Sequence, residues 1–265
     1  LLQEIDLRTD GHRSKPNVVY MHITPTCNLK CIHCNLPRVD GIAHGTLRRV
    51  TELSTDDWKR TLDNMREWLG PFKLNISGGE PLVRKDALEI LRHSCDLGIL
   101  TGIVTNGTFI NEKVADELAE MGMFNVNISL DGFRKETHLH FRGKDFEKTM
   151  NAFTLLKEAR VRHGVDLRIL TKFTLMGYNL DESIELVEWA KDFGLDGVMM
   201  QPLELAHEDT DLVYLWPQDF DHVDRTVKKL LDMKKAGYPL LNDTSHIEKF
   251  GLYFKSAMHQ QASLL

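Results

Sequence analysis

Six short segments rich in β-branched residues alternate with segments of helical periodicity, and this alternation constrains the fold more than any other feature of the sequence. The predicted strands are residues 17–24, 73–77, 100–105, 124–130, 166–175 and 197–202. The predicted helices are residues 54–69, 84–97, 111–121, 144–163, 180–193, 218–236 and 245–257. Strands separated by crossover helices pair in parallel, so the pattern predicts an α/β fold with a parallel sheet.

Two arrangements of such a sheet stay open, because the order of the strands cannot be read from one sequence: a partial (β/α)6 barrel of the TIM type, or an open doubly wound sheet. We favour the partial barrel, over residues 17–215. It would follow an N-terminal extension, residues 1–16, and precede a C-terminal helical segment, residues 216–265. In either arrangement ligands bind at the carboxyl ends of the strands, so the residues there are the candidates for function.

The composition is that of an ordinary globular protein. The chain of 265 residues carries 33 Lys and Arg against 39 Asp and Glu, a net charge of −6, so a nucleic acid is not an expected partner. No apolar run approaches the roughly 20 residues that span a bilayer, and no export signal precedes the first strand. We therefore expect a cytoplasmic protein without a membrane span. The first residue is not methionine, and we expect the natural protein to extend beyond the printed ends.

Three of the four cysteines lie directly after the first predicted strand, with the spacing Cys27-x-x-x-Cys31-x-x-Cys34. An odd number of clustered thiols in a chain without an export signal favours metal binding over disulfides. Three thiolates suit zinc or an iron–sulfur cluster. In a four-iron cluster they would leave one iron without a protein ligand, and an open coordination position is typical of catalytic metal sites.

Two non-catalytic metal modules are the alternatives. His33, between the cysteines, could complete a structural zinc site. Cys95 could complete the cluster of an iron–sulfur electron carrier if the fold brought it close. It lies in a predicted amphipathic helix, however, where a buried and inert thiol is the favoured interpretation.

The second predicted strand ends in Gly78-Gly79-Glu80. Two glycines after a strand permit a close approach of the backbone to a ligand, and a carboxylate beside them can accept hydrogen bonds from an ammonium group. At the carboxyl edge of a parallel sheet, these residues would lie beside the cysteine loop.

Four motifs in this order resemble those of the radical S-adenosylmethionine (SAM) enzymes. They are the cysteine motif at 27–34, Ser-Gly-Gly-Glu-Pro-Leu at 77–82, Thr-Asn-Gly at 105–107 and Ser-Leu-Asp-Gly at 129–132. The match extends from about residue 17 to residue 203. The chain looks most like the branch that holds the molybdenum-cofactor cyclase, enzymes of the haem pathway and peptide maturases of the SPASM type.

The resemblance implies a role for each matching residue. Cys27, Cys31 and Cys34 would hold a [4Fe–4S] cluster, whose fourth iron would take the amino and carboxylate groups of SAM. The residues expected to contact SAM are His33 through its main chain, Gly78, Gly79 and Glu80 at the amino group, Thr105 and Asn106, Ser129 and Asp131 near the ribose or carboxylate, Arg142 at the carboxylate and Gln201 at the adenosyl group. For Arg142 the alternative interpretation is a solvated loop cation.

The resemblance also implies the reaction. An electron from the reduced cluster enters the sulfonium, and SAM breaks into methionine and a 5′-deoxyadenosyl radical, which abstracts hydrogen from a peptide, a tetrapyrrole or a small metabolite. The enzyme would be an oxidoreductase or a transferase with a flavodoxin-like electron donor. SPASM relatives carry further cysteines for auxiliary clusters, and none follows Cys95 here. Either this enzyme uses a single cluster, or an auxiliary region lies beyond Leu265.

Residues that bind the substrate are predicted from the alternation along the fifth strand. Arg168 and Lys172 lie on its more polar face, which we expect to look into the barrel, and they could bind a carboxylate. For Arg168 the alternative is a salt bridge at the base of the barrel. His138 and His140 are expected on a surface loop and not as ligands, and no residue is singled out as catalytic.

Overall fold

Six parallel strands form one curled sheet in the computed structural model of the chain, which describes residues 14–34, 52–204 and 210–262. The strands pair in chain order: β1 (Val18–His22), β2 (Lys73–Ser77), β3 (Leu100–Thr105), β4 (Asn125–Ser129), β5 (Arg168–Leu175) and β6 (Gly197–Pro202). All neighbouring pairs are parallel, so their carboxyl ends lie at one edge. The order lacks the reversal of a doubly wound sheet, and the predicted partial (β/α)6 barrel is confirmed.

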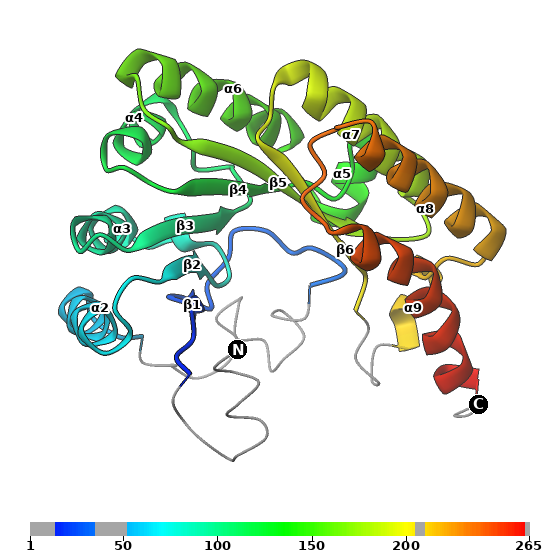
Figure 1. Cartoon of the computed structure of the whole chain (residues 1–265), viewed down its shortest axis with the longest axis horizontal. Coiled ribbons are helices and arrows are strands. Elements are labelled where there is room, and N and C mark those ends of the chain that lie inside the picture. Colours follow the sequence, from blue (N-terminus) through cyan, green and yellow to red (C-terminus); the bar gives the residue numbers. More distant parts are fainter. Residues whose placement is uncertain (1–13, 35–51, 205–209, 263–265) are drawn as a thin grey trace.

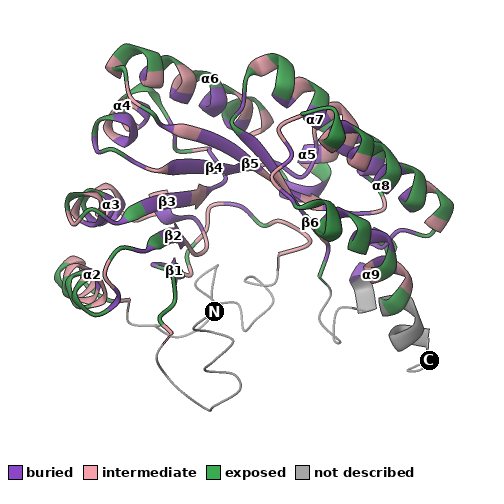
Figure 2. Cartoon of the chain, in the orientation of Figure 1, coloured by how far each residue is buried: buried purple, intermediate pink, exposed green. Residues whose placement is uncertain are grey.

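Helices cover the convex side of this sheet (Figure 1). The helices are α2 (Thr55–Leu69), α3 (Ala87–Asp96), α4 (Glu112–Glu120), α5 (Lys135–Arg142), α6 (Phe146–His163), α7 (Leu180–Phe193), α8 (Phe220–Lys235) and α9 (Thr244–Ala262), with 3-10 turns η2 (Pro81–Val83) and η3 (Thr210–Leu215). The outer helices turn their buried residues toward the sheet and their exposed residues toward solvent (Figure 2). Within the described ranges, none of the helices combines the length and the apolar character needed to cross a membrane.

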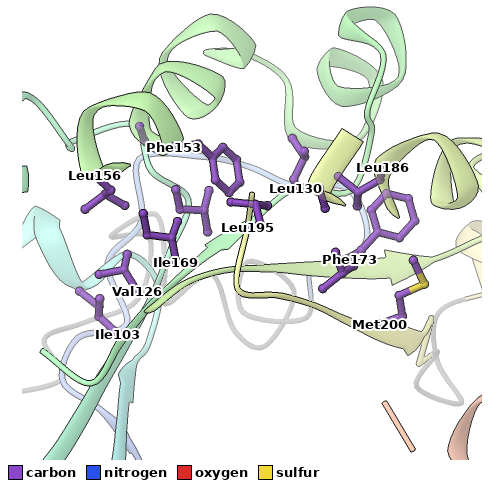
Figure 3. Packing of buried hydrophobic residues seen from close by; sticks show 14 of the residues in the cluster. Ile103, Val126, Leu130, Phe153, Leu156, Ile169, Phe173, Leu186, Leu195 and Met200 are labelled. Carbon is purple, nitrogen blue, oxygen red and sulfur yellow. The ribbon is translucent and has the colours of Figure 1, made fainter. Parts of the chain in front are cut away.

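The core fills the space between the sheet and these helices. Along β5, the alternate residues Ile169, Phe173 and Leu175 are almost fully buried, because every second side chain of a strand points to the same face. They pack with Phe153 of α6 and Leu186 of α7 (Figure 3). Burial of each such side chain stabilises the fold by about 1.5–3 kcal/mol. Arg168, Leu170, Lys172 and Thr174 belong to the opposite face of β5, which is the concave side of the sheet.

The helix α5 differs from the prediction, because its segment was expected to be a loop with His138 and His140 at the surface. His138 is instead fully buried. The inner face of α5 is formed by His138, Phe141 and Arg142, and the two polar residues among these three hide the apolar periodicity of the helix. A Cβ at Gly132 would lie 2.3 Å from the backbone nitrogen of His138. The glycine of the Ser-Leu-Asp-Gly motif therefore lets α5 pack against the loop that follows β4.

The C-terminal segment continues the sheet before its last helix begins. Leu240 forms a parallel bridge with Val198 of β6. The side chain of Asn242 accepts from the N–H of Met200 and donates to its carbonyl oxygen, both at 2.8 Å. These bonds satisfy backbone groups at the edge of β6 that a bare edge strand would leave unpaired. The helices α8 and α9 pack on α7 and β6, so this segment contacts the barrel directly, and the predicted domain boundaries stay predictions.

Candidate functional site

A cavity of about 170 Å³ lies at the carboxyl edge of the sheet, beside the cysteine loop. Its wall is formed by Cys27, Leu29, Cys31, His33, Cys34, Ser77, Gly78, Gly79, Val104, Thr105, Asn106, Ser129 and Arg142. These residues come from the loop after β1, the ends of β2, β3 and β4, and the last residue of α5. The structure thus brings the three clustered cysteines together with most of the residues predicted to contact SAM. The exceptions are Glu80, Asp131 and Gln201.

The two glycines after β2 let the cysteine loop pack against the end of that strand. The N–H of Gly79 donates to the carbonyl oxygen of Thr24 at 2.8 Å. A Cβ at Gly79 would lie 2.2 Å from the carbonyl oxygen of Thr26, and a Cβ at Gly78, whose φ is +141°, would lie 2.3 Å from that of Thr24. A side chain at either position would push the loop away. The two glycines were expected to let a ligand come close to the backbone. In the structure they also let the cysteine loop come close to it.

Asn28, between the first two cysteines, ties the loop to the end of β3. Its amide donates to Oγ1 of Thr108 at 2.9 Å and accepts from the side-chain amide of Asn106 at 2.9 Å. Its neighbour Leu29 is 2% exposed and anchors the loop in the core. Neither residue was singled out from the sequence. Their position between two cysteines of the motif was the only sequence feature that could have pointed to them.

Glu80 lies behind the cavity wall. Its fully buried carboxylate accepts hydrogen bonds from Oγ1 of Thr105 at 2.8 Å, from the N–H of Asn106 at 2.7 Å and from the N–H of Leu82 at 3.1 Å. Burial raises the pKa of Glu80 in spite of these donors. The carboxylate joins the ends of β2 and β3, and its contact with the amino group of SAM stays a prediction.

A buried ionic network joins the cysteine loop to α5 and β5. Asp131 is 1% exposed. Its Oδ2 lies 3.0 Å from Nε2 of His33 and 2.5 Å from Nη2 of Arg142, and its Oδ1 accepts from the N–H of Thr174 at 2.9 Å. Burial alone would raise the pKa of Asp131, but Arg142 and His33 hold it far below its usual range. The carboxylate is therefore ionised inside the protein.

Arg142 is the cation of this network and part of the cavity wall. It is 8% exposed, so the interpretation as a solvated loop cation is wrong. Burial lowers the pKa of Arg142, but Asp131, together with Cys31 and Cys34, more than compensates, so the net shift of the pKa is upward. Its Nε–H is buried and has no hydrogen-bond partner in the described part of the chain. A buried donor without a partner is costly, and a guanidinium donor suits a ligand that carries a carboxylate.

The three thiols of the loop are half-buried and form no disulfide. Burial raises the pKa of Cys31 to about 12 and also raises the pKa of Cys27. Such thiols stay protonated in an empty site but ionise when they bind a soft metal. Three soft donors around one cavity fit an iron–sulfur cluster with an open position. The free Nε–H of Arg142 fits the carboxylate of a molecule bound at that position.

Three other residues from the sequence predictions lie away from the cavity. Cys95 is on α3, in the outer layer, with its Sγ 3.7 Å from Sδ of Met123, so it is not placed to complete a cluster held by the loop. Arg168 is the first residue of β5 and lies at the base of the barrel, where its guanidinium stacks 5.5 Å from the ring centroid of Phe124. Among the described residues, no carboxylate forms the salt bridge that was considered for Arg168. Gln201 is exposed near the end of β6.

Lys172 faces the concave side of the sheet next to the cavity. In the register between β4 and β5 it is paired with Ser129, which lines the cavity. Its ammonium group lies 5.8 Å from the ring centroid of Tyr20 in β1, so the side chain reaches across the concave side. Burial lowers the pKa of Lys172. No carboxylate among the described residues forms an ion pair with it.

Comparison with known proteins identifies the family behind this geometry. The profile of the radical SAM superfamily matches residues 21–174, which is more than half of the chain and includes the cysteine loop and the whole cavity wall. The chain belongs to the radical SAM superfamily. Radical SAM proteins use a [4Fe–4S] cluster and SAM, the group and the cofactor that the donors of this cavity suit.

Several radical SAM relatives are named enzymes. An "AdoMet-dependent heme synthase" of Methanosarcina barkeri is 33% identical over 181 residues, which are 68% of this chain and 48% of the relative. An "Fe-coproporphyrin III synthase" of the same organism is 28% identical over 92% of this chain and 59% of the relative. The chain thus spans about half the length of the curated relatives it matches. Membership of this superfamily favours a catalytic centre over the two alternatives, a structural zinc module and a simple electron carrier.

A solved radical SAM structure supports the fold. The crystal structure of Streptococcus suis SuiB bound to precursor peptide SuiA matches with a TM-score of 0.72 at 18% identity, over 93% of this chain and 53% of SuiB. At this level of identity the likeness shows the curled α/β fold alone.

The buried His138 predicts a loss of stability in acid. Burial, with a contribution from Arg142, lowers the pKa of His138 to about 4, whereas a histidine in an unfolded chain titrates near 6.5. As the pH falls from about 6.5 to about 4, the unfolded chain binds the extra proton first, and the folded state loses up to about 3 kcal/mol. Urea unfolding at several pH values should show this slope weakened in His138→Phe and retained in the exposed control His246→Phe. An equal slope in wild type and His138→Phe would contradict the assignment.

Proposed function

We propose that this chain cleaves SAM reductively and directs the resulting 5′-deoxyadenosyl radical to a carbon–hydrogen bond of a peptide, a tetrapyrrole or a small metabolite. The observation that carries the proposal is the presence of three loop thiols and the free Nε–H of Arg142 in the wall of one cavity. When bound, the reduced [4Fe–4S] cluster supplies the electron that breaks the carbon–sulfur bond of SAM. A flavodoxin-like donor is expected to deliver that electron.

The residues of the chain would bind and orient the two groups. Cys27, Cys31 and Cys34 would hold the cluster, and Arg142 would bind the carboxylate of SAM. Ser129 and the backbone at 78–79 lie in the same wall, in reach of the rest of the cofactor. The apolar side chains that line the cavity would exclude water, which protects a reactive radical from side reactions.

The substrate is expected on the concave side of the sheet, where Lys172 provides a positive charge. Two curated relatives are named for work on tetrapyrroles, and SuiB is crystallised with a peptide. Both classes of molecule can carry carboxylates. A half-buried ammonium without an acidic partner in the described chain favours such a group, because the substrate would then neutralise a costly buried charge.

The proposal is tested by screening candidate substrates with the anaerobically reconstituted and reduced enzyme. A substrate should raise the formation of 5′-deoxyadenosine, measured by mass spectrometry, above the level without substrate. Incorporation of deuterium from a labelled substrate into 5′-deoxyadenosine would establish hydrogen abstraction. If the reduced, cluster-loaded chain binds SAM and yet never forms 5′-deoxyadenosine, the proposed reaction is wrong.

For a substrate found in this way, Lys172→Met should raise KM by about tenfold or more, because a hydrogen bond to a charged group contributes about 1.5–3 kcal/mol. The matched control is Lys73→Met, since Lys73 stacks on Phe124 at the other edge of the sheet, 5.3 Å from the ring centroid. Its KM should equal that of wild type. Steady-state kinetics with the free acid and the methyl ester of the substrate measure the effect. If Lys172→Met raised the KM equally for the free acid and for the methyl ester, Lys172 would not bind the carboxylate.

A further inference from the structure

Asp131 was expected to contact SAM, but its surroundings point to a different role. Both of its oxygens are occupied by donors of the chain: the N–H of Thr174 on Oδ1, and His33 and Arg142 on Oδ2. The residue is 1% exposed and does not belong to the cavity wall. The donors of the chain thus already hold the carboxylate, which lies behind the cavity wall and not in it.

The three donors belong to three different parts of the site. His33 lies between Cys31 and Cys34, and Arg142 is the last residue of α5 and a part of the cavity wall. Thr174 is on β5, two positions after Lys172 on the concave side of the sheet. One buried carboxylate therefore connects the cysteine loop, the expected binding site of the SAM carboxylate and the strand that faces the substrate.

The contacts of the loop show why this connection matters. The first part of the loop is held by the hydrogen bonds of Thr24 and Thr26 to the turn after β2. The second part is held by α5, through the bond of Ile32 N–H to the carbonyl oxygen of Phe141 at 2.9 Å and through the edge of the His33 ring, 6.2 Å from the Phe141 ring. The pair of His33 and Asp131 adds a charged acceptor to these neutral contacts, and such bonds are about twice as strong as neutral ones.

We propose that Asp131 is a positioning residue, which fixes the cysteine loop through His33 and fixes Arg142 by direct pairing, so that the cluster and the carboxylate of SAM are held at one relative position. The inference rests on the proposed function for the identity of the bound groups. The geometry of the loop is fixed by Asp131 whether or not these groups are bound.

The most selective variant is His33→Phe, because it keeps an aromatic ring beside Phe141 and leaves the pair of Asp131 and Arg142 intact. Only the bond from the loop to Asp131 is lost. The reconstituted full chain should then release iron to a chelator about tenfold faster or more, since the lost bond has a charged acceptor. His33→Gln, which restores an N–H donor, should return part of the protection. Asp131→Asn should release iron at least as fast as His33→Phe.

Asp196, which directly precedes β6, provides a matched control because it also accepts a hydrogen bond from β5. It accepts from the N–H of Ile169 in β5 at 2.8 Å and pairs with Arg160 at 2.7 Å, as Asp131 does with Thr174 and Arg142. Asp196 lies at the opposite edge of the sheet from the cavity. Asp196→Asn should weaken the fold and leave the rate of iron release per folded molecule unchanged.

Hydrogen exchange of residues 27–34, recorded on the full chain with and without iron, separates this inference from the proposed function. Faster exchange of the loop in His33→Phe, with wild-type exchange in Asp196→Asn, is the expected result in both states. If no cluster assembles at all, the proposed function fails while the exchange still tests Asp131. Unchanged exchange and iron release in His33→Phe and Asp131→Asn would overturn the positioning role. If Asp131→Asn lost affinity for SAM but kept the iron release and loop exchange of wild type, Asp131 would be a direct SAM contact and not a positioning residue.

Discussion

Replacing Cys31 with alanine is expected to abolish the assembly of the cluster and the cleavage of SAM. A four-iron cluster already held by only three thiolates would retain two, and its iron content should fall below about a tenth of wild type. The apo protein should stay folded, because the thiol is half-buried and its loss removes no described ion pair. Iron and sulfide analysis after anaerobic reconstitution, together with an assay for 5′-deoxyadenosine, measures the two effects.

The control is Cys95→Ala. The Cys95 thiol lies on α3 against Met123, outside the cavity, so this variant should keep the iron, the sulfide and the activity of wild type. Loss of the cluster in Cys95→Ala, or a full cluster in Cys31→Ala, would show that the ligand set has been assigned wrongly.

The second large effect is expected from Gly79→Ala. The new methyl group would lie 2.2 Å from the carbonyl oxygen of Thr26. Because a Cβ is held rigidly by its own backbone and the atom it meets is a backbone oxygen, the cysteine loop must move. Overpacking of this kind costs about 1–3 kcal/mol of stability, and a displacement of about 1 Å in an active site can lower the rate about a hundredfold. Thermal unfolding and the rate of 5′-deoxyadenosine formation should show both losses.

Gly251→Ala is the matched control for that substitution. In α9 the added Cβ would lie 3.1 Å from Oδ1 of Asp224, a side-chain atom that can move aside. Alanine also favours a helix over glycine by about 0.5–1 kcal/mol. This variant should therefore retain its stability and its rate. A Gly79→Ala protein as active as Gly251→Ala would mean that the loop does not depend on the glycine turn.

The strands and the place of the site were predictable because their signals are local. Residues 166–175 alternate in polarity, and the alternation corresponds to the two faces of β5, with Ile169 and Phe173 in the core. The spacing of the cysteines and the glycines after residues 73–77 placed two loops at the carboxyl edge of one sheet. The structure brings those loops into contact through Thr24 and Gly79.

The roles of several polar residues were not predictable, because they depend on contacts between distant segments. Asp131 and Glu80 were assigned to a ligand from their place in motifs, and that contact stays a prediction. The hydrogen bonds of their oxygens to Thr174, Arg142 and Asn106 of the chain itself could not be read from the motifs. The helix α5 escaped detection for a related reason. Its buried face contains a charged residue and a histidine. The sequence alone does not show whether a polar residue will be buried by contacts with a distant part of the chain.

The central claim is that three thiolates hold a [4Fe–4S] cluster whose open iron binds SAM. It is tested most directly by electron paramagnetic resonance of the anaerobically reconstituted, dithionite-reduced chain, recorded with and without SAM. We expect the signal of a reduced four-iron cluster and a clear change of that signal when SAM is added. A chain that takes up zinc in place of iron and sulfide, or a cluster whose spectrum does not respond to SAM, would contradict the account.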